Sequence, residues 1–254
     1  MNKTYKRVST KAVLYWLVMS ILFFDIVIQG NRLLDCALET DAEGSSRQEQ
    51  NAGQDQTGGN DAMDSDPYCD IIRVALTFDD GPHPVYTPML LDGLQERGVK
   101  ATFFVTGENA EAYPELIERM RKEGHLIGNH TYSHVELSAV GEETFFKELE
   151  QTSQILEELT GEEILFVRPP YGEWNKEIEA LCNMFPVLWD VDSLDWSSKN
   201  TQAVAKRVLK DVEDGDIILM HDSYLSTVEA ALYLIDVLTE QGYEFVTVDE
   251  LLFD

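Results

Sequence analysis

The sequence predicts an α/β domain with about seven parallel strands in residues 71–254. Two observations favour this fold class. Strand-like runs alternate with runs of helical character, which is typical of parallel strands joined by crossover helices. Ionisable residues follow most of the strand-like runs, and the carboxyl ends of the strands hold the chemistry in α/β barrels. Seven strands suit a barrel better than an open doubly wound sheet, and both arrangements remain open from the alternation alone.

The strand-like runs are short and rich in β-branched and aromatic residues, which favour strands. The first run, IIRVALTF, ends directly before two aspartates, and the last, YEFVTV, lies close to the end of the chain. The predicted strands are Ile71–Phe78, Val99–Val105, His125–Asn129, Ile164–Arg168, Phe185–Val191, Asp216–His221 and Tyr243–Val248.

Helical runs lie between these strands, and several of them close on glycine. Glycine is common just beyond the last helical residue because it adopts a left-handed conformation at little cost. The clearest helical runs are residues 87–98, 114–124, 142–161 and 228–242. A region of this length is large enough to bury a sizeable core.

The first 70 residues differ from the rest in composition. Residues 1–11 carry basic but no acidic side chains, and residues 12–28 form an apolar run interrupted only by Ser20 and Asp25. We interpret this run as an uncleaved transmembrane signal anchor with residues 1–11 in the cytoplasm. A cleaved export signal is the alternative, and either reading places the remaining chain outside the cell. Residues 29–70 predict a disordered acidic linker, because they contain few side chains that could be buried.

Composition excludes several functional classes. The chain has 47 acidic and 19 basic residues, a formal net charge of −28. From Ile71 onward there are 36 acidic and 13 basic residues, so the predicted domain itself is strongly acidic. Such a field repels anionic polymers, and no nucleic-acid partner is expected. The three cysteines are too scattered for a disulfide scaffold or a structural zinc site, although a Cys69–Cys182 bridge remains open.

Short polar motifs follow five of the predicted strands. They are TFDDGP with Asp79 and Asp80, HTYSH at 130–134, RPPYG at 168–172, DSLDW at 192–196 and LMHD at 219–222. Two histidines at positions i and i+4 can face one metal ion if the turn is helical, and a carboxylate can complete three protein ligands. Three of the five histidines lie at strand ends, so the pattern favours a metal site over ordinary polar loops.

These five motifs, in this order and spacing, resemble those of the metal-dependent polysaccharide deacetylases, the NodB-like family (carbohydrate esterase family four). The resemblance covers residues 71–254. It implies a distorted (β/α) barrel that removes acetyl groups from acetylated sugars. Members that are secreted or anchored in a membrane often act on peptidoglycan of the cell wall.

Carried over onto this sequence, the resemblance implies that Asp80, His130 and His134 bind a divalent metal, Zn²⁺ first and Co²⁺ or Ni²⁺ as alternatives. Asp79 is then the general base that takes a proton from water. Arg168 is implied to pair with Asp79 and orient it, with a weak surface ion pair as the competing interpretation.

The same resemblance assigns the remaining site residues. His221 is implied to be the general acid for the leaving amine, with Asp195 raising the pKa of its imidazole. The backbone N–H of Tyr171 would hold the oxyanion. Leu219 and Trp196 would line the pocket for the acetyl methyl, and both could instead be ordinary core or rim residues.

We therefore expect a monomeric, membrane-anchored hydrolase whose catalytic domain lies outside the cell. Its expected substrate is N-acetylglucosamine of peptidoglycan, with N-acetylmuramic acid, chitin oligomers and acetylxylan as alternatives. Two rival classes remain, a non-catalytic wall-binding module on the same scaffold and a different zinc hydrolase such as a peptidase. The presence of both Asp79 and His221 argues against the first rival.

Overall fold

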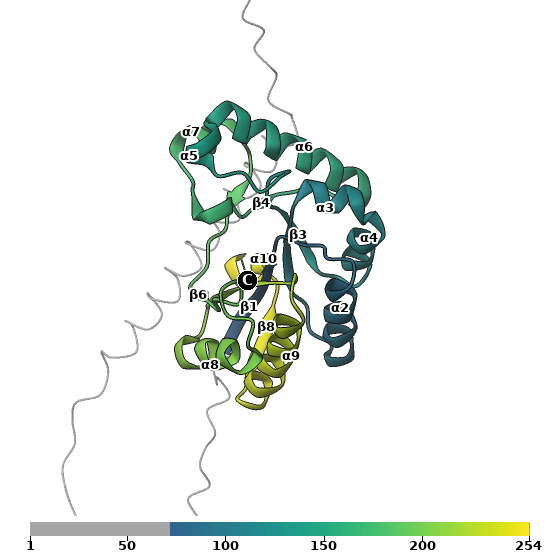
Figure 1. Cartoon of the computed structure of the whole chain (residues 1–254), viewed down its shortest axis with the longest axis vertical. Coiled ribbons are helices and arrows are strands. Elements are labelled where there is room, and N and C mark those ends of the chain that lie inside the picture. Colours follow the sequence, from purple (N-terminus) through teal and green to yellow (C-terminus); the bar gives the residue numbers. More distant parts are fainter. Residues whose placement is uncertain (1–71, 254) are drawn as a thin grey trace, which may run out of the picture. The chain divides into compact units, whose positions relative to one another are not determined.

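The computed structural model describes residues 72–253, which form a parallel sheet surrounded by helices (Figure 1). The sheet order is β5-β4-β3-β2-β1-β7-β6, and β8 also pairs with β1. Every observed strand pair is parallel, as predicted. The strands are β1 (Ile72–Asp79), β2 (Thr102–Val105), β3 (Leu126–Asn129), β4 (Phe166–Val167), β5 (Phe185–Pro186), β6 (Val191–Asp192), β7 (Ile217–His221) and β8 (Tyr243–Val246).

Helices connect the strands and lie around the sheet (Figure 1). The predicted helical runs are confirmed, and the first and third end at glycines with positive φ, Gly98 (66°) and Gly161 (72°). The helices are α2 (Tyr86–Arg97), α3 (Gly107–Ala112), α4 (Pro114–Lys122), α5 (Leu137–Val140), α6 (Glu142–Thr160), the 3₁₀ turn η1 (Pro170–Gly172), α7 (Lys176–Leu181), α8 (Thr201–Asp211), α9 (Leu225–Glu240) and α10 (Val248–Phe253).

Strand β1 is the centre of the sheet. Its residues from Val74 to Asp79 are all buried, because strands and helices cover it on every side. β7 pairs with one of its edges, while β8 and β2 share the other, β8 along the first half and β2 along the second. Phe78 stacks on Phe103 of β2 with ring centroids 5.4 Å apart, within the main apolar core.

The run Phe185–Val191, predicted as one strand, is divided between two strands at opposite ends of the sheet. β5 pairs with β4, and β6 pairs with β7, so the segment between them crosses the gap in the barrel. The carbonyls of Val187 and Leu188 in this crossing accept hydrogen bonds from Arg168. The run cannot continue as one regular strand because a side chain, and not a neighbouring strand, binds these carbonyls. The expected distorted barrel is confirmed, and its hydrogen bonding is incomplete between β5 and β6 over the described residues.

The predictions for the N-terminal region fall outside the described residues. These are the basic tail 1–11, the anchor 12–28 and the linker 29–70, together with Cys69 of the suggested bridge to Cys182. Among residues 72–253, no helix combines the length and the apolar character that crossing a membrane requires.

Candidate active site

The polar motifs meet because the register of the sheet aligns the carboxyl ends of the strands. Asp79, the last residue of β1, pairs with Phe104 of β2 on one side and with His221, the last residue of β7, on the other. One strand further along, Asn129 at the end of β3 pairs with Val167 of β4. The loops that begin at these residues therefore start from the same edge of the sheet.

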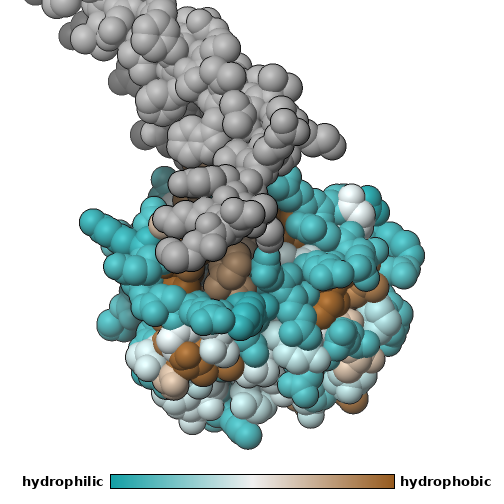
Figure 2. Space-filling model, turned by 90° about the horizontal axis from the view of Figure 1, so that it is seen from above, coloured by the Kyte–Doolittle hydropathy of each residue, from teal (hydrophilic) through white to brown (hydrophobic). Residues whose placement is uncertain are grey.

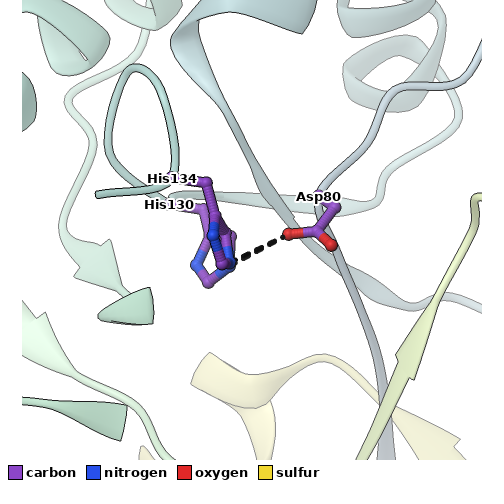
Figure 3. Close-up of side chains that lie close together, drawn as sticks. All are labelled: Asp80, His130 and His134. Carbon is purple, nitrogen blue, oxygen red and sulfur yellow. Dashed lines mark ion pairs between the residues drawn. The ribbon is translucent and has the colours of Figure 1, made fainter. Parts of the chain in front are cut away.

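Asp80, His130 and His134 form a compact cluster at this edge (Figure 3). The Nε2 atoms of His130 and His134 lie 3.4 and 3.3 Å from the same oxygen, Oδ1 of Asp80. That oxygen is buried and has no hydrogen-bond partner. Burial would raise the pKa of the Asp80 carboxyl, but the close approach of the His130 and His134 imidazoles lowers it to about 2.

The cluster fits a divalent transition metal. Two ligands about 2.1 Å from one ion at a tetrahedral angle lie about 3.4 Å apart, which agrees with the separations found here. Three protein ligands leave coordination positions open for water and substrate, as in catalytic zinc sites. The Nδ1 atom of His130 lies 2.6 Å from the carbonyl oxygen of Arg168. Since a carbonyl only accepts, Nδ1 carries the proton and the lone pair of Nε2 is free for a metal.

The backbone around the cluster is strained. Five non-glycine residues in the described part of the chain have positive φ, a conformation that most side chains disfavour. All five lie in loops that follow strands at this edge of the sheet. They are Asp80, Thr131, His134, Tyr171 and Leu194. Strain of this kind persists only where surrounding contacts enforce it, and it is concentrated at functional sites.

Asn129 is a supporting residue that the sequence did not reveal as important. Its side-chain oxygen accepts a hydrogen bond from the Thr131 N–H, and its amide donates to the Leu149 carbonyl and to the Ser153 hydroxyl. It therefore ties the strained turn between the two histidines to helix α6. An asparagine at the end of a strand was the only sequence signal for this role.

Asp79 and Arg168 form a buried pair below the cluster. The Nη1 atom of Arg168 donates to Oδ1 of Asp79 at 2.8 Å and to the Thr77 hydroxyl at 2.6 Å. Arg168 is completely buried, so the interpretation as a surface ion pair is wrong. Burial lowers the pKa of Arg168, and the Asp79 carboxylate opposes that shift. The other Asp79 oxygen, Oδ2, lies 3.8 Å from Nε2 of His130 and so faces the cluster.

His221 and Asp195 form a second pair on the opposite side of Asp79. The Nδ1 atom of His221 lies 2.8 Å from Oδ1 of Asp195, which is completely buried. Asp195 also accepts hydrogen bonds from the Thr227 hydroxyl and from the backbone N–H groups of His221 and Trp196. Burial lowers the pKa of His221, but the hydrogen bond and charge of Asp195 more than offset this and raise it to about 9.

The three remaining predicted residues differ in exposure. Tyr171 and Trp196 are 66% and 55% exposed, and the Tyr171 ring lies edge to face against His134, with centroids 5.0 Å apart. They are therefore rim residues at the site and not core aromatics. Leu219 is buried in β7, opposite Thr77 of β1, so it is a core residue of the strand that leads to His221.

Asp222, the residue after His221, is a buried carboxylate that sequence reasoning did not use. It is completely buried and accepts a hydrogen bond from the Thr87 hydroxyl of α2. Desolvation raises the pKa of Asp222 to about 7. A Cβ atom on Gly81 would lie 2.5 Å from its Oδ1, so the carboxyl fills the space directly behind the turn that follows Asp80.

Comparison with known proteins gives the family. A family model described as polysaccharide deacetylase matches residues 70–187. A peptidoglycan-N-acetylglucosamine deacetylase of Bacillus cereus is 40% identical over 190 residues, which cover 70% of this chain and 68% of that protein. The chain belongs to the polysaccharide deacetylase family. The resemblance based on the five motifs is thereby confirmed.

Two further likenesses concern one relative of this chain. Peptidoglycan-N-acetylmuramic acid deacetylase PdaC of Bacillus subtilis is 43% identical over 178 residues, covering 70% of this chain and 38% of that protein. A solved structure of PdaC has a TM-score of 0.70 at 42% identity and covers 72% of this chain and 90% of that one. The chain thus spans less than two fifths of the length of this relative.

Proposed function

We propose that this polysaccharide deacetylase is a metal-dependent hydrolase that removes N-acetyl groups from peptidoglycan, releasing acetate. The observation that carries the proposal is that a candidate base and a candidate acid lie beside one cluster of metal-binding side chains, Asp80, His130 and His134. Asp79 faces the cluster from the buried side, and His221, paired with Asp195, lies next to it on the neighbouring strand. A non-catalytic binding module would need neither group.

Asp80, His130 and His134 would hold the metal, which we propose to be Zn²⁺, with Co²⁺ and Ni²⁺ as alternatives. When bound, a divalent cation supplies Lewis acidity, which polarises the acetyl carbonyl and makes water more acidic. The ligand set of two imidazoles and one carboxylate suits these ions. Asp80 remains ionised over the physiological pH range, because its pKa is about 2.

Asp79 is the proposed general base. Its Oδ1 is held by the guanidinium of Arg168, so Oδ2 is the oxygen that can accept a proton from the attacking water. Arg168 itself cannot rotate away, because the carbonyls of Val187 and Leu188 and the Phe104 ring, 4.3 Å from its central carbon, fix its guanidinium. The base is thereby positioned before the substrate binds.

His221 is the proposed general acid. A pKa of about 9 means that the imidazole is protonated at neutral pH and can donate a proton to the leaving amine. Because Nδ1 is bound to Asp195, the proton would be donated from Nε2. We further propose that the Tyr171 N–H stabilises the oxyanion and that Trp196 and Leu219 line the acetyl pocket. The exposure of Trp196 at the rim supports contact with the sugar.

N-acetylglucosamine of peptidoglycan is the proposed substrate, and the relatives named above support a cell-wall glycan. PdaC, which is named for N-acetylmuramic acid, makes that sugar the second candidate. The apolar run 12–28 and the polar segment 29–70 support a single-pass membrane anchor with the domain outside the cell. Anchor and linker would hold a monomeric catalytic domain beside the wall.

The test is acetate release by the full chain, loaded with Zn²⁺, on peptidoglycan, chitin oligomers and acetylxylan. We expect release from peptidoglycan, and a fall of about 10²-fold or more in the Asp79→Asn and His221→Ala variants. Zn²⁺ binding, measured separately by titration, should persist in both variants because neither residue is a proposed ligand. Full activity in both variants, or peptide cleavage without acetate release, would contradict the proposal.

A further inference from the structure

Basic side chains are concentrated on one part of this acidic domain. Four of the thirteen basic residues after position 71 lie between Trp196 and Lys210, a stretch without an acidic residue. They are Lys199, Lys206, Arg207 and Lys210. The surface seen in Figure 2 is mostly hydrophilic, with apolar patches separated from one another. In a domain with 36 acidic and 13 basic residues after position 70, the acid-free stretch is therefore a local exception in charge.

These cations are largely free of ion-pair partners. Within residues 72–253, Lys206 and Arg207 make no salt bridge, and Lys199 lies over the Tyr224 ring, 4.5 Å from its centroid. Lys210 contacts Asp211, which is on the same helix and exposed. On α9, Asp236 is paired with Arg97, and Glu229 accepts a hydrogen bond from the Thr201 hydroxyl. Within residues 72–253, three of the four cations therefore have no carboxylate partner, and Lys210 is paired.

A groove of about 730 Å³ runs between α8 and α9 along this stretch. The two helices lie side by side (Figure 1) and pack closely. Ala205 and Leu209 contribute apolar surface, Lys206 and Lys210 contribute charge one turn apart, and the Tyr233 ring stands 52% exposed on the opposite helix. Gln202 and Thr201 complete the lining.

The groove is continuous in sequence with the candidate active site. The loop between β6 and α8 carries Asp195 and Trp196 and then leads through Lys199 to Thr201, the first residue of α8 and of the groove. A polymer that follows this loop out of the site would enter the groove at Thr201. Free carboxylates on that polymer would be repelled by most of the domain but attracted here.

We propose that the α8–α9 groove is a second binding site for the substrate polymer, taking a carboxylate-bearing saccharide of the glycan strand. The proposal rests on the proposed function, because it takes the polymer in the groove to be the one that is deacetylated. Lys206 and Lys210 bind the carboxylate, and Tyr233 packs its ring against the apolar face of the sugar. The groove then explains how so acidic a domain holds an anionic glycan.

The test compares binding of matched glycans to the full chain by calorimetry. The probes are peptide-free peptidoglycan fragments containing N-acetylmuramic acid, and the same fragments with that carboxyl reduced to an alcohol. In the Lys206→Gln/Lys210→Gln variant, Kd for the carboxylated fragments should rise about fivefold, as expected for two exposed charge pairs. Kd for the reduced fragments should stay unchanged. Tyr233→Ala should raise Kd for both probes, because the ring is lost. Tyr233→Phe should bind both probes as tightly as the unmodified chain, because it keeps the ring.

The matched control is Lys122→Gln/Lys147→Gln, which removes two exposed lysines from α4 and α6 and changes net charge equally. Unchanged Kd in this control supports the proposal. So does a raised KM with an unaltered kcat for acetate release in the Lys206→Gln/Lys210→Gln variant. Equal weakening in both variants, an equal effect on reduced fragments, or equally tight lysine-dependent binding of polyglutamate would overturn it. Because binding needs no turnover, groove-dependent binding without acetate release would contradict the proposed function and leave the groove supported.

Discussion

At the scale of single residues, Asp79 and Asp80 are adjacent carboxylates with different surroundings. Asp80 points its unpartnered Oδ1 at two imidazoles, whereas Asp79 is held by a completely buried guanidinium. Like charges this close destabilise a protein unless each is compensated. Here each has its own compensation, which supports the proposed roles of Asp80 as a ligand and Asp79 as a base.

The pair of His221 and Asp195 predicts the alkaline limit of activity. The folded-state pKa of His221 is raised from 6.5 to about 9, so the protonated acid is present below that pH and is lost as pH rises through it. Acetate release should therefore decline near pH 9. In Asp195→Asn the decline should shift by one pH unit or more toward neutrality, because the carboxylate that stabilises the imidazolium is gone. A pH profile of kcat/KM measures the position of the alkaline decline. The same position in Asp195→Asn and the unmodified chain would contradict the role assigned to Asp195.

Gly81 predicts a steric effect on the ligand cluster. A methyl group there would meet the buried Asp222 carboxyl, so Gly81→Ala must displace the turn that follows Asp80 or the carboxyl itself. We expect the free energy of unfolding to fall by about 1–3 kcal/mol, and Zn²⁺ affinity to fall with it. Denaturant unfolding and Zn²⁺ titration measure the two effects. Adding Asp222→Ala should restore part of the affinity, and wild-type affinity in Gly81→Ala alone would show that the turn adapts freely.

At the scale of secondary-structure elements, α6 supports the turn that carries both histidines. Phe145 and Leu149 on its buried face form an apolar cluster with Val167 and Ile178, and the Leu149 carbonyl binds Asn129. We expect Leu149→Ala to lower the free energy of unfolding by about 2–5 kcal/mol, because it leaves a cavity in this cluster. Chemical denaturation measures the loss. Glu150→Ala, at the exposed neighbouring position, should change the free energy of unfolding by no more than about 0.5 kcal/mol. Equal losses of stability in the two variants would contradict the packing assigned to α6.

At the scale of the whole molecule, the site is assembled by a preformed sheet, so the fold should not depend on the metal. Chelation of the Zn²⁺-loaded chain should abolish acetate release while far-ultraviolet circular dichroism stays unchanged. Re-addition of Zn²⁺ should restore activity, because the buried core of β1, β2 and β7 is independent of the three ligands. Loss of secondary structure on chelation would instead show that the metal is structural.

The sequence alone determined the order of strands and helices, the five motifs at the strand ends and the acidic charge of the domain. These could be predicted because composition, helix-ending glycines and motif spacing are local properties of the chain. The resemblance of the motifs implied the cluster of Asp80, His130 and His134, and parallel strands bring such residues together because their carboxyl ends meet at one edge of the sheet.

Only the tertiary structure decided the other features. It buried Arg168 and bound the Val187 and Leu188 carbonyls to it, which divided a predicted strand in two. It also placed Asp222 behind Gly81 and brought α8 beside α9 to form the basic groove. Each of these depends on close packing between residues far apart in the chain. Local pattern carries no information on which distant side chain fills a given space, and that is the physical limit of reading this protein from its sequence.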